Sequence, residues 1–205
     1  MSSEPEPGTL RPGGRTARVR AAVLAAAGDV LAERGFAELD LADIARRAEV
    51  GKTTVYRRWS SPTGLVTDLL AEMAEESLPR TATGSLRGDL AANAHLVQRT
   101  LTDPRQGPLF RAVIAAATCD AHTAQALGRF YEVRVAEWAP VVEEAVARGE
   151  LPAETDASEV VRAVSAPLYY RMLTTGSAPT GADADRAVAA AVAAAEAGVY
   201  VSSAG

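Results

Sequence analysis

Apolar positions along the chain recur with helical spacing nearly everywhere. Between about Thr16 and Arg34, and again between Pro62 and Leu78, apolar residues return every three or four positions. This pattern is typical of amphipathic helices, and no segment shows the strict alternation of a half-buried strand. We therefore expect an all-α fold.

Helix-stop and helix-start residues divide the amino-terminal part into short helices. Gly35-Phe36 is typical of a helix end, and Asp40 is a favourable N-cap for a short helix that follows it. A tight turn then leads to a helix from Lys52 to Trp59, and Ser61-Pro62 opens the next one. Two short helices joined by a tight turn indicate a helix-turn-helix.

The rest of the chain predicts five more helices after a linker at 79–84. They cover about 86–101, 108–118, 122–148, 156–176 and 183–197, and Asp156 with Glu159 predicts a capping box. Gly128, Pro140 and Pro167 lie inside two of them, so we expect breaks or kinks there. The expected organisation is a flexible tail at 1–15, a helix-turn-helix head at 16–78 and a helical body at 84–200.

The formal net charge of −5 conceals an uneven distribution. Residues 11–60 hold ten basic and six acidic residues, whereas residues 61–205 hold eleven basic and eighteen acidic ones. A basic head on an acidic body is compatible with DNA binding. The single cysteine, Cys119, and the lack of a signal peptide or a membrane-length apolar run predict a soluble, cytoplasmic protein with no membrane contact.

The helix at 52–59 has one packing face and one outward face. Val50, Val55 and Trp59 share a side and should pack on the head, which leaves Lys52 for a phosphate or guanine and Thr53 for a base. Arg15, Arg18 and Arg20 of the first helix should also lie near the DNA backbone. The predicted DNA contacts are Arg15, Arg18, Lys52, Thr53, Thr54, Tyr56, Arg57, Arg58 and Thr63. The alternative is a solvated basic face without a partner.

Residues 17–77 resemble the DNA-binding domain of the tetracycline-repressor (TetR) family of bacterial regulators. The matching residues are Gly35-Phe36, Asp43-Ile44-Ala45, Ala48, Val50, Lys52, Thr54-Val55-Tyr56, Trp59, Leu65 and Leu69. The stretch 166–171 before Thr175-Gly176 is similar to one subgroup of the family's carboxy-terminal domains. The resemblance implies a homodimeric transcriptional regulator on a palindromic operator, repression being the usual mode, with a small effector that releases the DNA.

Three residues depart from the family pattern. Glu49 stands where the tight turn usually has glycine, and Asp40 where a Ser or Thr often donates to phosphate. Pro62 lies near the place of a customary lysine. These changes predict weaker or more salt-sensitive contacts to the DNA backbone.

The body contains seven of the ten aromatic residues, which suits a pocket between helices. The residues predicted to line it are His95, Phe110, Tyr131, Trp138 and Tyr169. The expected ligand is a small apolar or amphipathic effector. Phe110 and Trp138 can equally be plain core residues. Two isolated histidines do not make a metal site, and we expect no cofactor.

Small residues on the last two predicted helices favour close packing against a second copy of the chain. The set comprises Ala163, Ala166, Ala187, Ala190, Ala191 and Ala194 together with Val160, Val164, Leu168, Val188 and Val192. Burial of the same faces within one chain is the alternative. A homodimer through these helices is the prediction.

Two other classes of protein are considered. Ser60, Ser61, His95 and Cys119 supply pieces of an active site, but no motif links them, so we do not expect an enzyme. A ligand-independent architectural DNA-binding protein stays open. It would bind DNA regardless of operator sequence and of small molecules.

Overall fold

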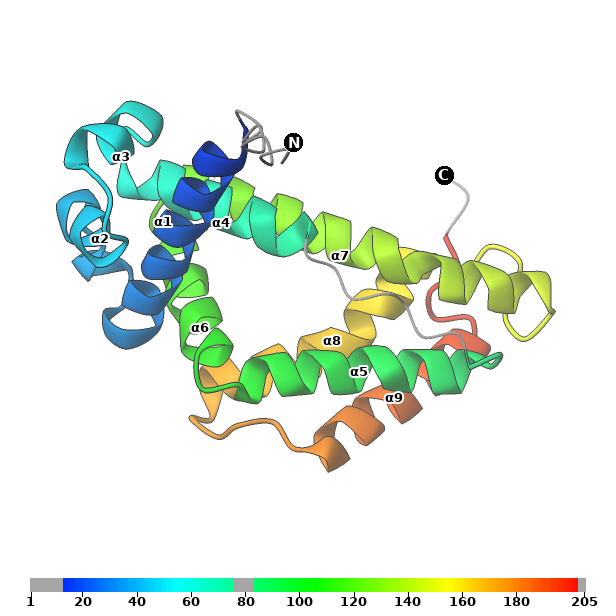
Figure 1. Cartoon of the computed structure of the whole chain (residues 1–205). Coiled ribbons are helices and arrows are strands. Elements are labelled where there is room, and N and C mark those ends of the chain that lie inside the picture. Colours follow the sequence, from blue (N-terminus) through cyan, green and yellow to red (C-terminus); the bar gives the residue numbers. More distant parts are fainter. Residues whose placement is uncertain (1–12, 76–82, 203–205) are drawn as a thin grey trace, which may run out of the picture.

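The computed structural model describes residues 13–75 and 83–202, and within them the chain is helical, without a β-strand (Figure 1). This confirms the predicted all-α fold. One short 3-10 helix, Phe36–Glu38, follows the first α-helix. The α-helices are α1 (Gly13–Arg34), α2 (Leu41–Arg47), α3 (Lys52–Arg58), α4 (Pro62–Glu75), α5 (Leu86–Thr102), α6 (Gln106–Ala117), α7 (Ala121–Ala147), α8 (Ala157–Thr174) and α9 (Gly181–Glu196).

Several predicted boundaries shift. Residues 13–15 of the predicted tail belong to α1, and residues 1–12 lie outside the described part of the chain. The predicted linker and the last turn assigned to the fourth helix also fall largely outside it, because residues 76–82 are not described.

Local capping explains where most of these helices begin. The Asp40 carboxylate accepts hydrogen bonds from the backbone N–H groups of Ala42 and Asp43, at 2.9 and 2.8 Å. The Ser61 hydroxyl accepts from the N–H of Gly64 at 3.1 Å, one turn into α4. Both caps stand where the sequence predicts them.

The predicted capping box at Asp156 is wrong in its second half. Asp156 accepts from the backbone of Ser158 and Glu159, but the Glu159 carboxylate pairs with Arg162 at 2.7 Å instead of returning to the cap. The reciprocal box occurs at the start of α9, between Thr180 and Asp183.

Of the break or kink expected in the longest helix, the break is excluded, because α7 runs through 27 residues with Pro140 inside it. The kink stays a prediction. Pro140 removes one backbone donor. Its neighbours Trp138, Ala139, Val141 and Val142 are all buried, so tertiary packing holds the helix together across the proline. Pro167 likewise lies within a continuous α8.

Two hydrophobic cores meet along α6 and α7. The first joins α1–α4 to Leu109, Phe110 and Val113 of α6 and to Phe130 of α7. The second lies among α5, α7, α8 and α9. In Figure 1 α4 lies along α7, and α1 packs against α6. The core of the head therefore continues into the body.

Candidate functional site

The turn between α2 and α3 is a Schellman motif, a helix ending in which two backbone N–H groups reach back to earlier carbonyls. The N–H of Val50 donates to the Ala45 carbonyl at 2.9 Å, and that of Glu49 donates to Arg46 at 3.2 Å. Glu49 is left-handed, with φ of 55°, and is the only non-glycine residue with positive φ in the described ranges. The turn thus adopts the backbone that glycine favours, with glutamate in its place.

Helix α3 is held on the head by its predicted packing face. The Val55 side chain is fully buried and Trp59 is 3% exposed. The Trp59 indole N–H donates to the Asp68 carboxylate of α4 at 3.0 Å. Val50 packs against the same core, half-buried. The orientation of α3 is therefore fixed by buried contacts.

The opposite face of α3 carries exposed polar and aromatic side chains. Lys52, Thr53 and Arg57 are exposed, Tyr56 is half exposed and Thr54 is half-buried. Neither Lys52 nor Arg57 forms an ion pair with any residue in the described ranges. Their charges are thus available to an external anion such as a phosphate.

Two arginines are partly or wholly engaged within the head. Arg20 pairs with Glu72 at 2.7 Å and approaches Asp68 at 3.6 Å, so it links α1 to α4 rather than reaching outward as we expected. Arg58 remains exposed, but its Nε lies 3.9 Å from Asp68 and its guanidinium 5.2 Å from the centre of the Trp59 ring.

The remaining predicted DNA contacts flank α3. Arg15 and Arg18 lie in the exposed amino-terminal turns of α1, where the Arg18 Nε donates to the Gly14 carbonyl at 3.2 Å. Thr63 is half-buried in the first turn of α4. Among the three cations of α3, Lys52 and Arg57 thus have no ion pair with a described residue, whereas Arg58 lies near Asp68.

The cations of α2 serve a different purpose. Asp43 accepts ion pairs from Arg34 at 3.5 Å, from Arg47 at 3.4 Å and from Arg46. Arg47 also bonds Glu33 at 3.0 Å, which raises the pKa of its guanidinium. The Arg34–Asp43 and Arg47–Glu33 pairs join α1 to α2, and they were not predicted because they link positions on separate helices. The pairs of Arg46 and Arg47 with Asp43 lie within α2.

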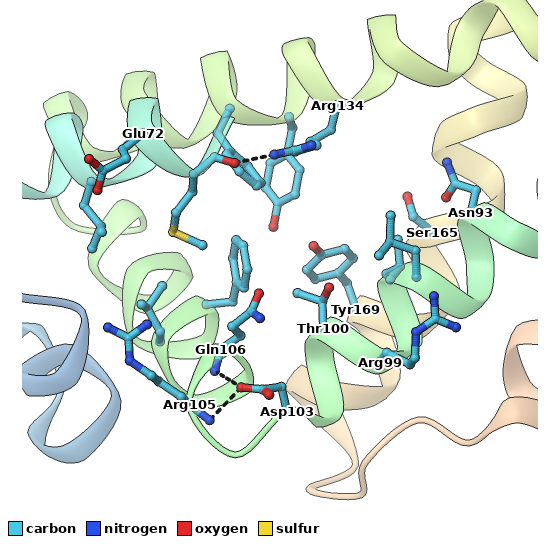
Figure 2. Close-up of a pocket in the computed structure, with 18 of the residues that line it drawn as sticks. Glu72, Asn93, Arg99, Thr100, Asp103, Arg105, Gln106, Arg134, Ser165 and Tyr169 are labelled. Atoms are coloured by element: carbon cyan, nitrogen blue, oxygen red, sulfur yellow. Dashed lines mark hydrogen bonds between the residues drawn. The ribbon is translucent and has the colours of Figure 1, made fainter. Parts of the chain in front are cut away.

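A cavity of about 720 Å³ lies between the head and the body, bordered by α1, α4, α5, α6, α7 and α8 (Figure 2). Four of the five predicted ligand residues line it: Phe110, Tyr131, Trp138 and Tyr169. Phe110 and Trp138 also belong to the two hydrophobic cores, as the alternative interpretation expects, and their contact with a ligand stays a prediction. A cavity of this size suits a drug-sized ligand.

His95 does not line this cavity, contrary to the expectation. Its Nε2 lies 2.9 Å from the Asp185 carboxylate of α9. On α5 the cavity is lined by Asn93, Leu96, Val97 and Thr100, which share one face at helical spacing, and by Arg99 beside them. Residue 95 points to another side, toward α9.

Sequence reasoning missed Phe130 and Arg134. Together with Trp138 they lie at intervals of four residues along α7 and line the cavity from that helix. This spacing, which puts side chains on one face, is the signal that could have found them. Arg134 lies 5.3 Å from the centre of the Phe130 ring.

The aromatic side chains form a connected series. Phe110 and Phe130 are 5.4 Å apart between ring centres, Phe130 and Tyr131 5.3 Å, and Tyr131 and Tyr169 5.5 Å in an edge-on arrangement. Burial raises the pKa of both tyrosine hydroxyls above the ordinary value. Both hydroxyls are therefore neutral near pH 7.

Two cavity-lining arginines tie the body to the head. Arg105, at the start of α6, bonds Asp29 at 2.5 Å and the Ala25 carbonyl at 3.0 Å, both on α1. Arg134 of α7 donates to the Met73 and Ala74 carbonyls at the end of α4 (Figure 2). Each of these arginines therefore bonds a helix of the head directly.

Most residues proposed for a dimer interface are buried within the chain. Of that set, Val160, Val164, Leu168, Ala187, Val188, Ala191 and Val192 pack between α8, α9 and their neighbours. Ala166 and Ala190 remain exposed, as do Tyr170 at 67% and Leu173 at 44%. A groove of about 310 Å³ runs between α8 and α9 beside Pro167, Tyr170 and Ala190.

The described residues form neither a metal-binding cluster nor a membrane-spanning helix. Across residues 13–75 and 83–202, no three His, Cys, Asp or Glu side chains gather closely enough to hold a metal ion. None of the helices in those ranges is both long and apolar enough to cross a membrane.

Comparison with known proteins identifies both parts of the chain. Residues 23–69 match the family of bacterial regulatory proteins of the tetR type, and residues 80–191 match the tetracyclin repressor-like carboxy-terminal domain. The HTH-type transcriptional regulator YdeS of Bacillus subtilis (strain 168) is 33% identical over 156 residues, covering 76% of this chain and 78% of YdeS.

Two further relatives agree. The DNA-binding transcriptional repressor TetR of Mycobacteroides abscessus is 29% identical over 154 residues, 74% of this chain and 80% of that protein. The crystal structure of the TetR family transcription regulator SCO0332 superposes with a TM-score of 0.68 at 29% identity, covering 86% of this chain and 97% of that one. The chain belongs to the tetracycline-repressor family of DNA-binding transcriptional regulators, which are not enzymes.

Proposed function

We propose that this protein is a repressor that binds a palindromic operator as a homodimer and is released by a small molecule bound in the cavity between head and body. The observation that carries the proposal is the pair of cavity-lining arginines, Arg105 and Arg134, bonded to α1 and α4. A ligand that displaces either side chain shifts the helices that support α3.

DNA recognition is assigned to the outer face of α3. Lys52 and Arg57 neutralise phosphates or read guanine, Thr53 approaches a base, and Thr54 and Tyr56 donate to the backbone. Arg15 and Arg18 of α1 and Thr63 of α4 add contacts to the DNA. The charge of Arg58 also attracts the DNA, although the nearby Asp68 offsets part of it. Such a protein acts where the chromosome lies, in the bacterial cytoplasm.

The second copy is proposed to pack on the exposed face of α8 and α9. Tyr170, Leu173, Ala166 and Ala190 supply apolar surface there, and small residues allow helices to approach closely. A two-fold axis through this face would pair each groove with the side chains of the other copy. The two α3 helices then read successive major grooves, about 34–36 Å apart.

A matched pair of variants tests the dimer. Ala190→Glu places a charge in the groove, whereas Ala189→Glu places it on an exposed position that does not line the groove. Sedimentation at micromolar concentration should show monomers for the first variant and dimers for the second. A wild-type monomer would refute the proposed assembly.

Selection of bound sites from random DNA tests operator reading. We expect two inverted half-sites, protected together in a footprint, and no comparable binding to scrambled DNA. Binding that ignores sequence would instead favour the architectural alternative, as would a complex unaffected by every ligand found to occupy the cavity.

A further inference from the structure

The cavity contains a buried hydroxyl group without a protein partner. The Tyr131 hydroxyl oxygen is inaccessible to solvent and makes no hydrogen bond to any residue in the described ranges. Buried hydroxyls are nearly always hydrogen-bonded, because leaving one unpaired is unfavourable. The neighbouring Tyr169 hydroxyl is close enough to affect the pKa of Tyr131, but the pair lacks a well-formed hydrogen bond. The two hydroxyls therefore keep hydrogen-bonding capacity for a molecule inside the cavity.

Other neutral polar groups line the same cavity, among them Tyr169 and Asn93. Figure 2 shows the Tyr169 hydroxyl turned toward the middle of the cavity, and its ring stands edge-on to Tyr131 at 5.5 Å. Asn93 is only 4% exposed, and no described residue bonds its side-chain amide. Tyrosine hydroxyls and amides can each donate and accept, so they recognise an uncharged polar atom.

Most charged groups of the lining are already compensated. Glu72 pairs with Arg20 at 2.7 Å, Arg105 with Asp29 at 2.5 Å and Arg134 with Glu137 at 2.8 Å. The Asp103 carboxylate accepts from the backbone of Arg105 and Gln106, as Figure 2 shows. Arg99, the remaining lining cation, is exposed to solvent. A charged ligand would enter the cavity without a free counter-charge in its interior, which is unfavourable.

The walls favour a flat ligand. Phe110, Phe130, Tyr131 and Tyr169 form the connected aromatic series, and Trp138 lines the same space. Aromatic rings stack or pack edge-to-face on one another, so a planar ring system makes the most contact with them.

We propose that the effector is an uncharged, flat aromatic molecule bearing a phenolic or ketone oxygen, and that the Tyr131 and Tyr169 hydroxyls bind this oxygen. The proposal rests on the proposed function, in which the cavity holds the effector. It adds the chemical class of the ligand and the two residues that select it.

Three matched probes test this class: 1-hydroxypyrene, pyrene and pyrene-1-carboxylate. Their affinities for the full-length protein are measured without DNA by equilibrium dialysis at pH 7, from the fluorescence of the probe. We expect 1-hydroxypyrene to bind about tenfold more tightly than pyrene, as one neutral hydrogen bond allows. The carboxylate should bind more weakly than the hydroxyl compound.

Conservative variants assign the oxygen contact. Tyr131→Phe and Tyr169→Phe should each reduce the preference for 1-hydroxypyrene over pyrene while leaving pyrene affinity unchanged. Tyr200→Phe, which makes the same chemical change outside the cavity, should keep the full preference. Using two separate variants guards against a fold defect in one of them.

Three results would overturn the proposal: tighter binding of the carboxylate than of 1-hydroxypyrene, a preference that survives both variants, or no binding of 1-hydroxypyrene. Because the assay contains no DNA, its failure is separate from failure of the proposed function. A protein that shows the expected probe pattern but binds no selected operator retains the ligand site and refutes the regulatory role.

Discussion

Replacing Glu49 by glycine should stabilise this protein through the backbone alone, because the replacement neither removes nor adds a side-chain contact. Glu49 has φ of 55° at the end of α2 and is exposed, without an ion pair to any described residue. The chain provides its own reference, because α7 and α9 end in the same Schellman motif. There the equivalent position is glycine: Gly149 with φ of 77° and Gly198 with φ of 76°.

The expected gain follows from the backbone alone. A left-handed conformation costs a residue with a Cβ atom roughly 1–2 kcal/mol, and the greater freedom of glycine in the unfolded chain returns part of this. We therefore expect Glu49→Gly to raise the free energy of unfolding by about 1 kcal/mol, or the melting temperature by about 2–4 °C.

Two control variants separate conformation from charge. Glu49→Gln removes the charge but keeps the Cβ atom, so it should leave stability nearly unchanged. Gly149→Glu should lose about 1 kcal/mol, since an added Cβ there meets no other atom and only the positive φ opposes it. Thermal unfolding at one fixed protein concentration measures all three variants.

The same variants bear on DNA binding. Glycine and glutamine at position 49 remove the same negative charge beside α3, so both should raise operator affinity equally, and the gain should shrink as salt increases. If Glu49→Gly proves no more stable than Glu49→Gln, the assignment of strain to this turn is wrong.

Three further changes give sharp expectations. Lys52→Ala should weaken operator binding by about 1–3 kcal/mol without changing the melting temperature. Arg87→Ala removes an exposed cation of α5 and should leave operator binding unchanged. If anisotropy titrations show unchanged affinity for Lys52→Ala, the placement of α3 on DNA is refuted. Gly107→Ala should destabilise the protein by about 1–3 kcal/mol in urea unfolding, because the added Cβ atom would lie 2.4 Å from the Leu101 carbonyl oxygen. If this variant is as stable as the wild type, the close junction between α5 and α6 is contradicted. Hydrogen bonds from Thr180, with Arg171 and Arg186 nearby, lower the pKa of Asp183 from 3.8 to about 2. The contribution of Asp183 to stability is therefore complete above about pH 4 and is lost as pH falls through about 2. Asp183→Asn should flatten the pH dependence of stability in this window, and an unaltered acid profile would count against the capping box.

The sequence by itself determined the order of the helices and the caps of α2 and α4, since these depend on interactions a few residues apart. Asp40 and Ser61 cap α2 and α4 through bonds that span two or three residues. The resemblance to the family also marked Glu49 as unusual, because the family usually has glycine in this turn, and the structure gives Glu49 a left-handed φ of 55°. The packing face of α3, Val55 and Trp59, followed from periodicity.

Local patterns failed where burial decided the outcome. Pro140 does not end α7, because buried neighbours on both sides hold the helix. The valines of α8 and α9 that suggested an interface pack inside the chain, and an apolar stripe alone does not indicate which partner covers it.

Only the tertiary structure decided which side chains meet. Arg20 turns inward to Glu72, 52 residues away, and His95 turns to Asp185, 90 residues away. The cavity exists because α1 and α4 pack against α6 and α7, and its ties to the head join Arg105 to Ala25 and Arg134 to Met73. Helix periodicity shows on which face of its helix a residue lies, but not which helix packs against that face. The packing of helices that are distant in sequence around shared cores decides this.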